Sequence, residues 1–356
     1  MSLYPASDSE KIEELLDKTD LYLDINYGGE VDGVFNLLSD KSIPSFAFYK
    51  TQNGEQGQYL FSIRNVDAMV AAIRNYAETK QLPNKPFDFE VQTIDETLDY
   101  ILEHQSSIAR FGDGEVAIML GQSINYQKYD PNLAEELKFI FNQESSPTLV
   151  IGLQEGLKNR FSFVPDALAF WRQYLEDYEE FYLEYCKNNW YGSTFISRPY
   201  IDFLDKSKSK TQFEKLKKLW EGRDILIVEG YASRSGVGND LFDGAKSIKR
   251  IICPSRHAYD KKNEIMEAII NHADGRLVLL MLGPTAKVLA YQLAIKGMQA
   301  IDIGHVDSEY EWMQMGAENK VLLRNKHTAE FNLDTEIELA DDESYLSRVI
   351  VDLSAE

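Results

Sequence analysis

The segment ARFGDGE, residues 109–115, places two carboxylates two positions apart in a glycine-flanked turn. Asp113 and Glu115 can face one point there, because glycine lets the backbone bend sharply. Paired carboxylate oxygens suit a hard cation such as Mg²⁺ or Mn²⁺. An acidic helix start explains the same pattern and is favoured on spacing alone. Arg110 and Gly112, which precede the pair, are candidate phosphate contacts, since arginine forms charge-assisted hydrogen bonds with phosphates.

A second candidate loop has the sequence SRSGVGND and directly follows an apolar run. Gly236 and Gly238 predict a tight strand-to-helix turn, where backbone N–H groups favour an anion. Ser235 and Asn239 flank these glycines, and we expect the four residues together to contact a phosphate or a nucleotide. Leu241 stands where a dinucleotide fingerprint needs its third glycine, so a complete G-x-G-x-x-G is absent. A plain strand-to-helix turn is the alternative interpretation.

A third candidate begins with Gly283 at the end of another apolar run. Pro284 suits the first turn of a helix, and Thr285 offers a hydroxyl group at the same place. The backbone geometry at such a helix start favours an anion. Ordinary helix capping explains these residues equally well.

The segment DIGHVDSEYEWM, residues 302–313, gathers several titratable side chains and supplies the candidates for a general base. A general base needs a titratable group in a cleft near the proton that it removes. Asp307 and Glu309 are the first candidates, because a carboxylate is ionised at neutral pH without any shift of its pKa. His305 is a third candidate, with orientation of a phosphate or a substrate as its expected role. A solvated helix face is the alternative for each.

Composition limits the class of protein. The chain has 356 residues, 44% of them hydrophobic, which suits one large α/β domain with a smaller appendage. A net charge of −21 argues against nucleic acid or an anionic membrane as the main partner. No apolar run approaches the roughly 20 residues that span a bilayer. Two cysteines and a polar, acidic N-terminus, unlike a secretory signal, predict a cytoplasmic protein.

From about residue 92, apolar runs alternate with helical patterns. Several runs are apolar almost throughout, which is typical of a sheet buried on both faces. The alternation predicts an α/β fold with a Rossmann-like, mostly parallel sheet, whose carboxyl edge carries the candidate loops. The strand candidates are residues 106–111, 148–153, 224–230, 248–254, 276–283 and 299–304, and the helix candidates are residues 167–186, 215–220, 239–245, 260–272 and 286–295.

Residues 1–88 have a different rhythm, with short strand candidates and one amphipathic helix. The stretch QLPNKPFDF, with two prolines, predicts a boundary after them. We therefore expect a small N-terminal α/β appendage over residues 1–88, a main domain over residues 89–330, and an acidic, peripheral tail over residues 331–356.

Four ordered motifs resemble the GT-D glycosyltransferases, the former domain of unknown function 1792, over about residues 92–325. They are ARFGDGE, SRSGVGNDLFDGAKSIKRIICP, GPTAKVLAYQLA and QAIDIGHVDSEYEW. The resemblance implies a Rossmann-like fold distinct from GT-A and GT-B, a UDP-sugar donor (UDP-glucose in the described members), and metal binding at Asp113 and Glu115. It further implies a role in building glycans on streptococcal serine-rich adhesins or other surface polymers.

The segment LYLDINYGGEV is similar to pieces of multi-part bacterial surface-glycan glycosyltransferases. Residues 1–88 are therefore expected to be a remnant of a second transferase module, or an element that binds an acceptor or another glycosyltransferase.

The expected function is metal-dependent transfer of a hexose from a UDP-sugar to a glycan or glycoprotein acceptor. Inversion of the anomeric centre by direct displacement is expected, with one base that takes the acceptor proton. A nucleotide-binding Rossmann oxidoreductase is one alternative, and the missing third glycine counts against it. A catalytically inactive accessory module of a transferase complex is the other, and the intact Asp113 and Glu115 pair counts against that.

Overall fold

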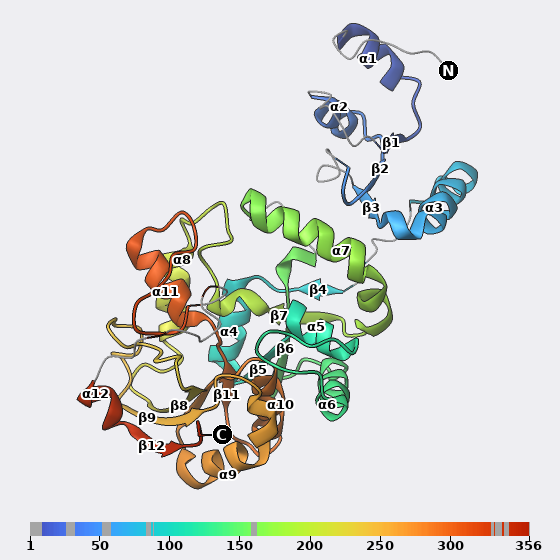
Figure 1. Ribbon diagram of the computed structural model, residues 1–356. Coiled ribbons are helices and arrows are strands. Elements are labelled where there is room, and N and C mark those ends of the chain that lie inside the picture. Colours follow the sequence, from blue (N-terminus) through green and yellow to red (C-terminus); the bar gives the residue numbers. More distant parts are fainter. Residues whose placement is uncertain are drawn as a thin grey trace. The chain divides into compact units, whose positions relative to one another are not determined.

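The computed structural model describes residues 9–25, 33–51, 58–82, 87, 89–157, 162–328, 331, 337 and 342–355. The chain divides into two compact units (Figure 1). The smaller unit consists of Met1–Asp88 and Gly156–Cys186, and the larger unit consists of Phe89–Glu155 and Lys187–Glu356.

The larger unit is built on a nine-stranded sheet, in the order β12-β9-β8-β10-β11-β5-β6-β7-β4. Each neighbouring pair in it is parallel, which confirms the predicted fold class. The strands are β4 (Glu90–Val91), β5 (Ser107–Arg110), β6 (Leu149–Leu153), β7 (Trp190–Ser193), β8 (Asp224–Gly230), β9 (Ser247–Cys253), β10 (Leu277–Met281), β11 (Ala300–Asp302) and β12 (Val349–Asp352).

Helices cover this sheet, and the central strands β5, β6, β10 and β11 are buried at every position. Burial on both faces explains why these strands read as continuous apolar runs in the sequence. α10 (Pro284–Ala294) packs on β5, β10 and β11, beside α6 (Pro131–Phe141) and α9 (Lys262–Ala273). α5 (Asp113–Met119) packs on α6. α8 (Ser209–Lys217) lies between α4 (Ile94–His104) and α11 (Val306–Met315).

Helix starts follow local sequence signals. Thr93 accepts a hydrogen bond from the Glu96 N–H, and the Glu96 carboxylate accepts from the Thr93 N–H, so a capping box begins α4. Pro284 occupies the first turn of α10, where its missing N–H leaves no hydrogen bond unmade.

Two expectations for the larger unit were wrong. Residues 239–245 form successive turns instead of a helix. Positive φ angles at Arg234, Gly236 and Gly238 turn the chain repeatedly before them, and the Leu241 carbonyl accepts a hydrogen bond from the Trp220 indole N–H. The C-terminal segment is not a peripheral tail, because β12 pairs with β9 and Tyr345 is buried.

The smaller unit holds a three-stranded parallel sheet in the order β1-β2-β3. Phe46, Phe48 and Met69 form one of its apolar clusters. Its elements are α1 (Ser9–Leu16), β1 (Tyr22–Asp24), α2 (Val34–Asp40), β2 (Ser45–Phe48), β3 (Tyr59–Phe61), α3 (Val66–Thr79) and α7 (Pro165–Tyr185), the last of which the chain supplies between β6 and β7.

Polar contacts fasten α7 to the N-terminal residues of this unit. The Tyr49 hydroxyl donates to Glu179 Oε1 at 2.5 Å, and the Ser62 hydroxyl donates to Glu176 Oε2 at 2.8 Å. Both glutamates are buried, so these hydrogen bonds offset the desolvation of their carboxylates. The sequence had not indicated that residues 156–186 pack with residues 1–88. None of the described helices is long and apolar enough to cross a membrane.

Candidate functional site

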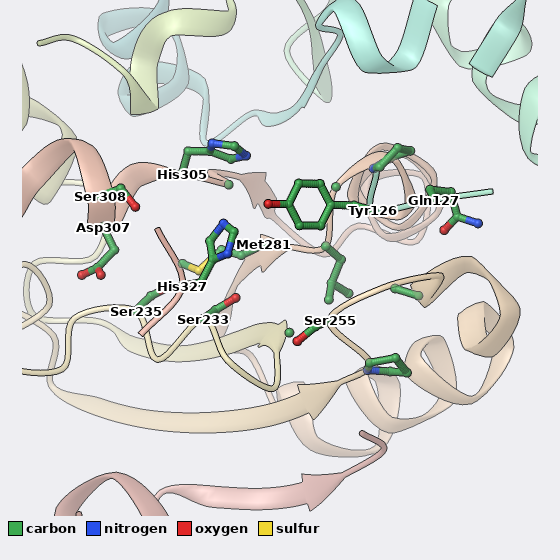
Figure 2. Close-up of a pocket in the computed structure, with 17 residues that line it drawn as sticks. Tyr126, Gln127, Ser233, Ser235, Ser255, Met281, His305, Asp307, Ser308 and His327 are labelled. Atoms are coloured by element: carbon green, nitrogen blue, oxygen red, sulfur yellow. The ribbon is translucent and has the colours of Figure 1, made fainter. Parts of the chain in front are cut away.

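A cavity that is open to solvent lies in the larger unit where β8, β9, β10 and β11 end (Figure 2). After β8 the chain moves to β9, on one side, whereas after β10 it moves to β11, on the other side. The crevice at such a reversal is where open parallel sheets bind ligands. Of the residues singled out in the sequence, Ser235, Gly283, His305 and Asp307 line this cavity.

Three aromatic rings border the cavity, and two of them, Tyr126 and His327, were not predicted from the sequence. Figure 2 shows Tyr126, His305 and His327 around the same space. The centroid of the His327 ring lies 5.7 Å from that of Tyr126 and 6.1 Å from that of His305. Tyr126 and His327 come from irregular segments, where no periodic pattern marks a residue as functional. Such rings offer flat surfaces on which a planar ligand group can stack.

The loop after β8 is held by buried charges. The Ser235 N–H donates to Glu229 Oε2 at 2.8 Å, and Arg250 Nη2 donates to the Ser235 carbonyl at 2.8 Å. Arg250 and Glu229 also form a fully buried ion pair. The Gly236 N–H donates to Asp307 Oδ1 at 2.8 Å. The N–H groups expected to hold an anion at a helix start therefore bond to carboxylates, and the helix itself does not form.

Asp307 joins the wall of the cavity to this loop. Besides the Gly236 N–H, its carboxylate accepts from Asn239 Nδ2 at 2.9 Å and from Lys326 Nζ at 2.9 Å. Glu311 Oε1 accepts from the same two side chains, Asn239 and Lys326. These contacts hold the Asp307 carboxylate between the cavity and the loop after β8.

Glu309 lies outside the cavity lining and is fully buried. Its Oε2 accepts from the N–H groups of Tyr200 and Ile201, both at 3.1 Å. Desolvation by complete burial raises the pKa of Glu309 to about 7, although the charge of Arg198 opposes the shift. These contacts give Glu309 the role of fastening the chain at residues 200–201 to α11.

Asp113 and Glu115 occupy the first turn of α5, as the acidic helix start required. Glu115 Oε2 accepts from the Gly112 N–H at 2.7 Å, and Oε1 pairs with Lys287 Nζ at 3.0 Å. Asp113 is exposed. Over the described part of the chain, no three His, Cys, Asp or Glu side chains gather in a way that could hold a metal ion by themselves.

The guanidinium group of Arg110 forms hydrogen bonds within the protein. Nε donates to the Asp302 carbonyl at 2.6 Å, and Nη2 donates to Asp302 Oδ1 at 3.0 Å and to the Gly304 carbonyl at 3.2 Å. Nη1 donates to the Thr194 carbonyl at 3.0 Å and to Ser197 Oγ at 2.5 Å. All five N–H donors of the side chain are engaged. This differs from the expected phosphate contact, and Arg110 instead fixes Gly304 at the rim of the cavity.

Lys287 connects the acidic turn to the cavity. Its ammonium group lies 3.0 Å from Glu115 Oε1, 3.2 Å from Asp302 Oδ2 and 3.1 Å from the carbonyl of Gly283, which lines the cavity. Burial by itself raises the pKa of Asp302, but the charges of Arg110 and Lys287 outweigh that effect and hold the pKa below its ordinary value. Thr285, in the same turn as Gly283, is fully buried, which argues against direct ligand contact.

A family model described as glycosyltransferase GT-D fold matches residues 108–331. The chain belongs to this family of GT-D glycosyltransferases. A second model, described as the GftB/GlyA-F C-terminal domain, matches residues 1–88.

Two curated relatives match almost the whole chain. Glycosyltransferase GlyD of Streptococcus pneumoniae serotype 4 is 52% identical over 351 residues, which are 98% of this chain and 43% of that protein. The probable glycosyl transferase Gly of Streptococcus gordonii is 49% identical over 349 residues, which are 97% of this chain and 50% of that protein. The chain thus spans about half the length of these relatives, or less.

Solved structures confirm the fold. A new glycosyltransferase (DUF1792) from Streptococcus sanguinis is 53% identical, with a TM-score of 0.74, and the match covers 74% of this chain and 99% of that chain. A DUF1792 structure described as having a distinct glycosyltransferase fold is 50% identical with the same TM-score, covering 75% and 96%.

Proposed function

We propose that this chain transfers a hexose, glucose by resemblance, from a UDP-sugar to a glycan or glycoprotein acceptor. One observation carries the proposal: in a chain of the GT-D family, a buried lysine connects the cavity at the strand-order reversal to the Asp113 and Glu115 turn. Lys287 provides the link, since it contacts Glu115 on one side and the carbonyl of Gly283 on the other. Family membership argues against the oxidoreductase alternative.

The cavity is assigned to the nucleotide donor. It is open to solvent and lies at the carboxyl ends of the strands, where open parallel sheets bind their ligands. The rings of Tyr126 and His327 suit the nucleobase, because a pyrimidine can stack on an aromatic face. The hydroxyl groups of Ser233, Ser235 and Ser255, which also line the cavity, suit ribose and phosphate oxygens.

The donor set at α5 fits a divalent cation that is shared with the diphosphate. Mg²⁺ and similar ions are commonly held by one or two carboxylates together with substrate phosphates, so Asp113 and Glu115 suffice as protein ligands. Glu115 already accepts two hydrogen bonds, yet a carboxylate has about four lone-pair sites. When bound, such an ion would stabilise the charge of the departing UDP.

The base is assigned to the His305 and Asp307 pair, because both side chains line the cavity and Glu309 does not. His305 leads, since an ordinary histidine pKa of about 6.5 suits proton removal at neutral pH. Asp307 is the second candidate, because its carboxylate oxygens already accept hydrogen bonds from three donors within the protein. Direct displacement by the acceptor hydroxyl, with its proton passing to this base, inverts the anomeric centre. NMR of the product decides this point, and a retained anomeric configuration would exclude the single displacement.

The test of the activity is a titration of purified protein with a panel of UDP-sugars and Mn²⁺, followed by UDP release. We expect UDP-glucose to bind with Mn²⁺ present, and Asp113→Ala to lower turnover by on the order of a hundredfold while the protein stays folded. Asp113 is exposed, so its truncation leaves no core cavity. Glu103→Ala, at an exposed acid on α4, is the matched control. Wild-type turnover by Asp113→Ala in Mn²⁺ contradicts the metal assignment.

We further propose that the smaller unit binds the acceptor or a second glycosyltransferase. The match of residues 1–88 to the GftB/GlyA-F C-terminal domain supports this, because it marks these residues as separate from the GT-D region at residues 108–331. Hydrogen–deuterium exchange of the full chain with a glycosylated serine-rich peptide checks it. Protection within residues 33–82 is expected, whereas protection confined to the cavity loops would speak against it.

A further inference from the structure

Lys287 is a buried cation that lies between Glu115, in the acidic turn that begins α5, and Asp302, at the end of β11. Its side chain is 7% exposed, and its carboxylate partners Glu115 and Asp302 are 9% and 1% exposed. A third contact, from Nζ to the carbonyl of Gly283, accounts for the remaining N–H donor of the ammonium group. Lys287 is therefore held at one position, within direct contact of a proposed metal ligand.

Lys287 belongs to a buried network in which two carboxylates pair with two cations. Glu115 and Asp302 are the carboxylates, and Lys287 and Arg110 are the cations that pair with them. A divalent ion bound at Glu115 adds positive charge beside a fixed ammonium group, in a place where burial weakens screening by water. Asp113 offsets part of this charge, and a nucleoside diphosphate brings the further negative charge that favours the ion.

We propose that Lys287 makes binding of the divalent ion depend on the donor diphosphate. In the protein without donor, the ammonium group occupies Glu115 and repels the ion. With donor present, the diphosphate offsets that repulsion, while Lys287 keeps its contact with Asp302. Lys287 is thus a positioning residue that couples two ligands of one site. This inference rests on the metal role proposed for Asp113 and Glu115.

The first measurement uses the wild-type chain. Free Mn²⁺ is followed by electron paramagnetic resonance while protein is added, with and without UDP. We expect Mn²⁺ to bind at least about tenfold more tightly with UDP, because opposite charges only a few ångströms apart interact strongly in a partly buried site. Equal affinities overturn the inference and also the sharing of the ion with the diphosphate, whereas the Lys287 variants below test the coupling by itself. An absence of Mn²⁺ binding under both conditions instead contradicts the proposed metal site.

The second measurement uses Lys287→Gln and Lys287→Met. Glutamine keeps a donor for Asp302 and so guards against loss of folding, whereas methionine keeps the volume without charge. Both are expected to bind Mn²⁺ more tightly than wild type when UDP is absent, by on the order of tenfold, and to show a smaller effect of UDP. Lys215→Met is the control, since Lys215 also bridges two carboxylates, Asp95 and Asp99, on helices outside the cavity lining.

The outcomes separate the roles that a lysine can play here. Unchanged Mn²⁺ affinity in folded Lys287→Gln overturns the coupling. Weaker UDP binding without Mn²⁺, together with unchanged Mn²⁺ affinity, also overturns it, because that pattern belongs to a lysine that contacts phosphate directly. If neither variant folds, the wild-type comparison decides, since equal Mn²⁺ affinity with and without UDP leaves no coupling to explain.

Discussion

At the scale of single residues, contacts decide whether a polar side chain binds a ligand or fastens the chain. Arg110 and Glu309 both have the residue types of a catalytic site, yet each is buried and bonds to backbone groups of the protein. His305, four residues before Glu309, and Ser235, in the loop after β8, line the cavity instead. Residue type and spacing do not distinguish these cases, because the difference lies in contacts between segments far apart in the sequence.

Glu309 gives a pH-dependent stability that can be measured. Its folded pKa of about 7 lies above the ordinary value of 4.5, so the folded protein holds the proton more tightly than the unfolded chain. The contribution of Glu309 is most favourable below pH 4.5 and is lost as the pH rises towards 7. Across that window, we expect it to cost about 3 kcal/mol of unfolding free energy.

Glu309→Gln isolates this effect, since glutamine keeps an oxygen that accepts from the Tyr200 and Ile201 N–H groups. Urea unfolding between pH 4.5 and pH 8 is the measurement. Relative to wild type, the variant should gain stability as the pH rises. A constant difference between the two proteins at every pH would mean that Glu309 does not titrate in this range. Comparison with wild type also cancels the contribution of Glu155, whose pKa burial likewise raises to about 7.

The two glycines of the loop after β8 should respond differently to alanine. Both have positive φ angles, 77° at Gly236 and 84° at Gly238. A Cβ atom at Gly236 would lie 2.4 Å from the ring of Phe242, whereas no atom lies within 4 Å of a Cβ at Gly238. Gly238→Ala should therefore cost about 1 kcal/mol of backbone strain. Gly236→Ala should cost about 2–4 kcal/mol, because overpacking adds to that strain.

Denaturant unfolding of both variants, with UDP titrations alongside, checks this prediction. Equal losses of stability would show that Phe242 moves aside without cost. Normal UDP affinity in both folded variants would assign the loop a structural role alone.

At the scale of elements, the sequence was informative where a local signal decides the outcome. Fully buried strands, the Thr93 capping box and the Pro284 helix start all follow from neighbouring residues. It was uninformative where a distant partner decides. The turns at residues 239–245 depend on Trp220. β7 (Trp190–Ser193) was not among the strand candidates, because its pairing partners, β4 and β6, lie elsewhere in the chain.

Tyr345 shows how the C-terminal segment supports the cavity loop. Its ring lies 4.7 Å from the guanidinium carbons of both Arg234 and Arg250, and its hydroxyl donates to Glu229 at 3.3 Å. Tyr345→Ala should lower the unfolding free energy by about 3–5 kcal/mol and weaken UDP binding, because Glu229 and Arg250 hold Ser235. Tyr345→Phe keeps the ring and should cost about 1 kcal/mol.

Unfolding curves and UDP titrations of the two Tyr345 variants are the measurement. If Tyr345→Ala binds UDP as wild type does, the C-terminal segment contributes to stability only. A loss in Tyr345→Phe as large as that in Tyr345→Ala would mean that the hydroxyl group, and not the stacked ring, supports the loop.

At the scale of the whole molecule, α7 is the element that sequence reasoning placed in the wrong unit. Its sequence is rich in glutamate, which is typical of a solvated helix face. Glu176 and Glu179 are nevertheless buried, because Ser62 and Tyr49 donate to them. Such partners cannot be recognised from the helix alone, since they lie more than a hundred positions earlier in the chain.

This arrangement affects how the chain can be made and divided. The smaller unit needs α7, so it cannot be complete on the ribosome until residue 185 has emerged, after β4, β5 and β6 have been synthesised. A cut at residue 88 separates the N-terminal residues from their helix and leaves Glu176 and Glu179 without Ser62 and Tyr49. Recombination at that boundary would therefore move an incomplete unit, and an exchangeable cassette must carry residues 156–186 as well.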